Sequence, residues 1–259
     1  MRLMKRILSA AAVLALSVSL LAGCGSTAAS PVSSAASTAA ESTTSSVVSE
    51  TTSAAADENA AAAAQLLNDL TGSYQELWPV ILADEYQQTW LDDCTALVGE
   101  ENAEAAFEKL SSMVTGDVYG EDAVEAYANG GGAYFCGFTN SLATLTFDGE
   151  TSTISGTDKD GNVLFSHTYH YIGMEPVRGL YEFESDDADS GEFTYFFLAP
   201  DTSAETYHIE FRYGSDADAL SQYDAGDYAY WLASGISTDC DQTMIDNCIE
   251  LFCTENLAG

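Results

Sequence analysis

Histidine is the side chain in this sequence best suited to bind a metal ion or to move a proton, and it occurs three times, as His167, His170 and His208. All three fall in segments whose Thr, Tyr, Phe and Val content and alternating polarity predict β-strands. Within the strand expected over Val163 to Ile172, alternation places His167 on the aromatic face and His170 on the other face. We therefore expect His167 to point into the protein.

His208 and Glu210 share one face of the strand expected over Thr206 to Tyr213. If the inward faces of two strands meet inside a closed sheet, His167 and His208 approach each other. Neutral imidazoles beside a carboxylate suit zinc, so we take His208, His167 and Glu210 as candidate metal ligands. Binding should then fade as the pH falls through the histidine range of about 6 to 7. The alternative is a histidine that is hydrogen-bonded to a Tyr or Asp within a polar barrel interior.

The secondary structure that we expect to position these side chains changes from helices to strands along the chain. Asp148-Gly149 and Asp160-Gly161 separate successive strand-like runs, and Asp-Gly favours a tight hairpin turn. We expect Glu58 to about Asn129 to be mainly helical, and Tyr134 to Tyr213 to be an antiparallel meander that closes into a barrel. The expected helices cover Glu58 to Leu70, Leu82 to Leu97, Glu101 to Met113, Glu121 to Ala128 and Gln242 to Leu251. The expected strands cover Thr144 to Phe147, Thr151 to Ser155, Val163 to Ile172, Leu180 to Glu184, Phe193 to Leu198 and Thr206 to Tyr213.

Motifs that would carry other chemistry are incomplete. The run from Asp158 to Asn162 starts like a calcium loop but lacks the third acidic position and the terminal Glu, so a hairpin turn is the better interpretation. Asp186, Asp187 and Asp189 cluster between two strands, where a solvated hairpin tip is favoured over weak calcium binding. There is no Gly-x-Ser-x-Gly motif and no cysteine beside a histidine, so we do not expect an enzyme.

The N-terminus has the pattern of an exported lipoprotein. A basic start precedes an apolar run from Ile7 to Leu21, which is shorter than the roughly 20 residues of a spanning helix. Ala22-Gly23 before Cys24 resembles the bacterial lipobox, in which the cysteine is acylated and becomes the new N-terminus. We expect a signal peptide over residues 1–23, a lipid anchor at Cys24 with a disordered linker to residue 57, and one folded domain over residues 58–259. That domain would lie in the cell envelope, outside the cytoplasm, and the anchor would be its membrane attachment.

Net charge narrows the classes of partner. The chain carries a formal charge of -34, and removal of three cations with the signal peptide takes it to -37. Nucleic-acid binding needs a basic surface, so it is excluded, whereas metal cations and cationic surfaces are favoured. Alternatively, the negative charge keeps an exported protein soluble and has no role in binding a partner. The cations that remain are Lys109, Lys159, Arg178 and Arg212.

Five cysteines follow the anchor, and an odd number cannot pair completely within one chain. Exported proteins can keep disulfides, and the spacings contain no C-x-x-C pair of a zinc knuckle. We expect structural packing or one or two disulfides among Cys94, Cys136, Cys240, Cys248 and Cys253.

The last expected strand carries a family resemblance. Glu205-Thr206-Tyr207-His208-Ile209 and the glycine turn that follows at Tyr213 to Asp216 resemble the His-x-His-Ile strand of the ZinT zinc-recruitment family. Phe193 to Pro200 is similar to that family's strand ending in Ala-Pro. The resemblance implies an α+β fold, a lipocalin-like (calycin) antiparallel β-barrel with N-terminal helices and a C-terminal helix.

The resemblance also implies zinc binding through three histidines outside the cytoplasm, in support of zinc import. His208 matches one ligand, but Thr206 stands where its neighbouring histidine belongs, and Phe196 stands where the upstream histidine belongs. A zinc site would therefore be rebuilt around His208 with His167 or a carboxylate such as Glu210. We expect an envelope lipoprotein that binds zinc or a related divalent ion, with a metal importer of the ABC class as partner. The alternative is a metal-free barrel that binds a small molecule or another envelope component.

Overall fold

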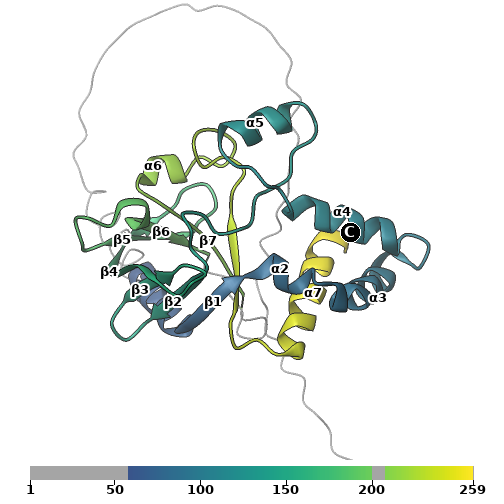
Figure 1. The fold of residues 1–259 in the computed structure, drawn as a ribbon, viewed down its shortest axis with the longest axis horizontal. Helices are drawn as coiled ribbons and strands as arrows, with labels where there is room; N and C mark the ends of the chain where they lie inside the picture. Colours follow the sequence, from purple (N-terminus) through teal and green to yellow (C-terminus); the bar gives the residue numbers. More distant parts are fainter. Residues whose placement is uncertain (1–57, 200–207, 259) are drawn as a thin grey trace, which may run out of the picture. The chain divides into compact units, whose positions relative to one another are not determined.

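Eight strands form a closed antiparallel barrel in a computed structural model that describes residues 58–199 and 208–258 (Figure 1). Each strand pairs with the next one in the sequence, and β1 pairs with β8 to close the barrel. The expected signal peptide, Cys24, the linker and Thr206 lie outside the described residues. The strands are β1 (Gly72–Glu76), β2 (Thr144–Asp148), β3 (Thr153–Thr157), β4 (Val163–Met174), β5 (Tyr181–Ser185), β6 (Tyr195–Leu198), β7 (His208–Gly214) and β8 (Ala233–Ser237).

Most of the helices are inserted between β1 and β2 (Figure 1). Asp241 begins the last helix by accepting a hydrogen bond from the Met244 backbone N–H at 3.0 Å, which satisfies one of the free N–H groups at the helix start. A first helix covers residues 58–69. The others are α2 (Leu77–Ile81), α3 (Gln87–Val98), α4 (Ala103–Val114), α5 (Glu121–Ala128), α6 (Ala217–Leu220) and α7 (Gln242–Leu257), with 3-10 turns at Asp84–Tyr86 and Gly191–Phe193.

Aromatic rings fill the barrel interior. Inward-facing residues of the strands form one buried cluster, and Leu66, Leu67 and Leu70 of the first helix and its end pack onto it. The largest of its fully buried aromatic side chains that point into the barrel are Phe147, Phe183, Phe196, Phe211, Tyr213 and Trp231. The interior of this barrel is therefore a packed core, as expected for a small barrel.

A second buried cluster lies between the barrel wall and helices α3, α4 and α7. Ile236 of β8 contributes to it from the barrel side, and Trp90 of α3 packs against Phe107 and Phe252. Cys94 and Cys253 face each other within this cluster, with their sulfur atoms 3.9 Å apart. The five cysteines are free thiols, so the structure shows the packing alternative.

The barrel and the flanking helices confirm the expected α+β, lipocalin-like class. One part of the expectation is wrong, because Gly72–Glu76 lies in the stretch expected to be helical yet pairs as β1 with both β2 and β8. The run at Asp158 is confirmed as a hairpin turn, since its carboxylate accepts hydrogen bonds from the backbone N–H groups of Asp160 and Asn162. In the other Asp-Gly turn, Ser152 rather than the glycine takes the positive backbone angle, with φ of 53°.

None of the helices over residues 58–199 and 208–258 is long and apolar enough to span a bilayer.

Candidate functional site

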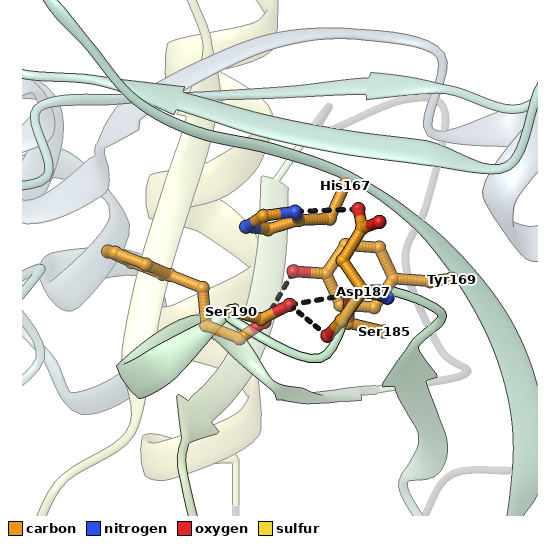
Figure 2. Close-up of polar contacts among 6 residues, drawn as sticks. His167, Tyr169, Ser185, Asp187 and Ser190 are labelled. Atoms are coloured by element: carbon orange, nitrogen blue, oxygen red, sulfur yellow. Dashed lines mark hydrogen bonds and ion pairs between the residues drawn. The ribbon is translucent and has the colours of Figure 1, made fainter.

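His167 lies on the inner face of β4 near one end of the barrel, as expected from alternation. Its neighbours on that face, Phe165 and Tyr169, belong to the barrel core, and the Phe165 ring centroid is 5.9 Å from that of His167. The imidazole Nδ1 is 2.8 Å from a carboxylate oxygen of Asp187, which follows β5 (Figure 2). The His167 side chain is 16% exposed and that of Asp187 is 52% exposed. The pair therefore sits where the packed interior meets solvent.

The turn after β5 holds Asp187 in place through hydroxyl groups. The Ser185 hydroxyl accepts a hydrogen bond from the Asp187 backbone N–H at 3.1 Å. Ser190, which is buried, donates to the Ser185 hydroxyl at 2.7 Å and is 2.8 Å from the Asp187 carbonyl oxygen (Figure 2). Below them the Tyr169 hydroxyl donates to the Phe193 carbonyl, and burial raises the pKa of Tyr169. The carboxylate of Asp187 is thus positioned by a fixed turn.

This geometry determines which ring nitrogen of His167 can act on a ligand. A carboxylate beside Nδ1 favours the tautomer that carries its proton there, because that N–H donates to the carboxylate. The Nε2 atom then holds the free electron pair. Histidines that bind metals are commonly supported by a carboxylate in this way, which fixes the ring and increases its basicity. The Asp187–His167 pair can therefore present one nitrogen ligand to a divalent metal ion.

A second pair of the same kind lies on the outer face of β4. His170 Nδ1 is 2.7 Å from a carboxylate oxygen of Asp186, and both side chains are about half exposed, at 52% and 53%. Adjacent aspartates thus reach histidines on opposite faces of one strand. Exposed pairs of this type contribute little to stability because water screens them. The His170–Asp186 pair therefore serves as a control for the His167–Asp187 pair in experiments.

His208 and Glu210 lie on the outer face of β7. They alternate with Ile209 and Phe211, which face inward and belong to the barrel core. Both side chains are partly exposed. Glu210 raises the pKa of the Cys136 thiol, although burial is the larger cause. The carboxylate and this thiol therefore lie close enough to interact electrostatically.

The structure does not bring His167 and His208 together. His167 faces the barrel interior from β4, whereas His208 is the first residue of β7, three strands further round the closed barrel. The two histidines also lie on opposite faces of the sheet. Within the described parts of the chain, no three His, Cys, Asp or Glu side chains gather as a metal-binding group.

Phe196, at the position where the resemblance places an upstream histidine, is fully buried inside the barrel. Its ring centroid lies 5.3 Å from that of Tyr213 and 5.4 Å from that of Tyr169. It faces the interior whereas His208 faces outward, so these two positions do not converge.

Asp186, Asp187 and Asp189 are exposed in the turn after β5, as expected of a solvated hairpin tip. Sequence reasoning missed that the carboxylates of Asp186 and Asp187 contact histidines. The hairpin was the signal available in the sequence. A hairpin of β4 and β5 brings the two aspartates after β5 next to the two histidines of β4.

No family model matches this sequence. A search of curated proteins also finds no match. Among solved structures, the zinc-bound ZinT-like domain of AdcA from Streptococcus pneumoniae is similar, at 15% identity and a TM-score of 0.45, over 71% of this chain and 89% of the other. Zinc-bound AdcA from the same organism matches at 14% identity and a TM-score of 0.43, over 72% of this chain and 35% of the other, so this chain spans about a third of it. The first of these structures bears the name of the family that the His208 strand resembles.

Proposed function

We propose that this chain is an exported, lipid-anchored protein that binds zinc or a related divalent ion as its cargo, in support of uptake by an ABC importer. The observation that carries the proposal is the contact of Asp187 with His167 Nδ1, which leaves Nε2 as a nitrogen ligand at the barrel end. The formal charge of -34 adds support, since an acidic surface raises the local concentration of cations.

The arrangement supports a binding protein rather than an enzyme. The serine hydroxyls nearest in sequence to Asp187 are used within the turn, since Ser190 donates to Ser185 and lies within hydrogen-bond distance of the Asp187 carbonyl. A nucleophile would instead have to be hydrogen-bonded to the imidazole that activates it. One supported nitrogen ligand also fits a cargo that must leave again, because fewer protein ligands hold a metal less tightly.

Zinc titration of the metal-free mature chain by calorimetry tests the proposal. Binding is expected in the wild type, with loss of binding in His167→Ala and a roughly 10- to 100-fold weaker affinity in Asp187→Asn, because the amide no longer supports the ring. His170→Ala is the matched control, since it removes an aspartate-paired histidine from the outer face of the same strand.

Three results bear on the proposal in different ways. Absence of zinc binding by the wild type at micromolar protein would overturn it. Loss in His208→Ala with normal binding in His167→Ala would move the site to the outer face of β7. Equal loss in His167→Ala and His170→Ala would indicate an effect on the turn after β5 rather than on a ligand.

The membrane attachment is tested separately at Cys24, which lies outside the described residues. Because the cysteine thiol is the acylated group of a lipobox, Cys24→Ala is expected to release the protein into the medium or to leave an unprocessed precursor in the membrane. Fractionation followed by mass determination of the mature N-terminus distinguishes these forms. Normal processing and membrane association in the variant would contradict a lipid anchor at this residue.

A further inference from the structure

An open cleft of about 350 Å³ lies where the barrel meets the helices, far in the sequence from the histidine pairs. Glu76 at the end of β1 and Trp78 in α2 form part of its lining, and Val114 at the end of α4 adds to it. The segment around Phe135 and Cys136 completes it. Figure 1 shows α2 leading directly from β1 towards the helices beside the barrel. Volumes from about 300 Å³ upward are typical of small-molecule sites.

The cleft contains the carboxylate of Glu76, and one of its two oxygens is available to accept a hydrogen bond. Glu76 accepts a hydrogen bond from the Phe138 backbone N–H through Oε1, at 2.6 Å. The ion pairs recorded over residues 58–199 and 208–258 are the two histidine–aspartate pairs, so Glu76 has no cationic partner there. Its Oε2 atom can therefore accept from a cationic ligand. A half-buried charge of this kind attracts an opposite charge more strongly than a fully solvated one.

Two aromatic residues give the cleft apolar walls. Trp78 is 8% exposed and packs edge-to-face on Phe252, with ring centroids 4.8 Å apart. Phe135 is stacked on Tyr119, with centroids 5.5 Å apart. Rings held in place in this way offer their faces and edges at little cost in conformational entropy. An ammonium group near such rings is attracted by their π-electrons, and tryptophan gives the strongest interaction.

We propose that this cleft binds a small organic ammonium ion with an apolar or aromatic body. The ammonium group pairs with Glu76, and the apolar body lies between Trp78 and Phe135. This site is separate from the histidine pairs, and an organic cation is a different class of ligand from a metal ion. The acidic surface steers both classes in the same way.

Titration of the mature chain with 2-phenylethylamine, followed by tryptophan fluorescence, tests the site. The neutral isostere 2-phenylethanol is the matched ligand, because it keeps the aromatic body and lacks the charge. Saturable binding of the amine is expected, with binding of the alcohol weaker by about tenfold or more, since hydrogen bonds to charged groups are the stronger ones. Saturating zinc is expected to leave the amine affinity unchanged.

Variants locate the site. Glu76→Gln keeps an acceptor for the Phe138 N–H and removes the charge, so the amine is expected to bind about tenfold more weakly or worse while the affinity for the alcohol stays the same. Glu104→Gln, on the exposed face of α4, removes an equal charge elsewhere and should leave both affinities unchanged. Circular dichroism confirms that each variant is folded. Equal affinity for amine and alcohol, normal amine binding by Glu76→Gln, or no binding at millimolar amine would each overturn the proposal.

Discussion

Phe196→Ala is expected to lower the free energy of unfolding by about 3–5 kcal/mol, the range for truncation of a fully buried Phe. The ring is 0% exposed and packs against Phe165, Tyr169 and Phe211 inside the barrel. Its loss removes buried apolar surface and leaves a cavity that a closed barrel cannot collapse to fill. Urea unfolding followed by circular dichroism measures the change as a lower midpoint at an unchanged slope.

Val163→Ala is the control for Phe196→Ala. Val163 is also an apolar strand residue, but it is 71% exposed at the start of β4, so its truncation is expected to change stability by no more than about 0.5 kcal/mol. A small loss in Phe196→Ala would mean that the barrel interior is loosely filled. The interior would then have room for a ligand, which the packed arrangement does not provide.

Much of the barrel could be predicted because most of its strands show an alternating pattern in their own sequence. The residues of β4 alternate clearly, and Phe165 and Tyr169 face the core as alternation requires. The expected strands over residues 144–147 and 193–198 fall on β2 and on β6 with the turn before it. A period of two residues is enough to identify such strands when one of their faces is buried.

The strands that escaped prediction depend on distant partners. β1 has five residues, Gly-Ser-Tyr-Gln-Glu, of mostly polar character, and it forms because β2, about 70 residues later, and β8 supply its hydrogen bonds. β8 reads Ala-Ser-Gly-Ile-Ser, and its outer face is covered by helices, so its polarity does not alternate. No local pattern encodes such pairing. The same limit applies to the candidate site, because which strand ends meet decides that His167 contacts Asp187 and not His208.

Arg212→Leu is expected to destabilise the protein by about 3–5 kcal/mol, as when one partner of a buried charged interaction is removed. The guanidinium of Arg212 is completely buried on the outer face of β7, although arginine is almost never found there without partners. Its two terminal nitrogens donate to the backbone carbonyls of Leu220 and Tyr228. Its central carbon lies 4.3 Å from the centroid of the Tyr223 ring. One side chain therefore ties the segment after β7 back onto the barrel.

Leucine preserves the apolar volume and leaves those carbonyl oxygens without donors, and each hydrogen bond from a charged group is worth about 1.5–3 kcal/mol. Arg212→Lys is expected to recover less than half of the loss, because a single ammonium cannot reach carbonyls on two sides as the planar fork does. Lys159→Met removes a cation from an exposed turn and should be nearly neutral. Urea midpoints of the three variants test this. Full recovery by lysine would show that Arg212 acts through its charge alone, and that the fork geometry does not hold the segment from Leu220 to Tyr228.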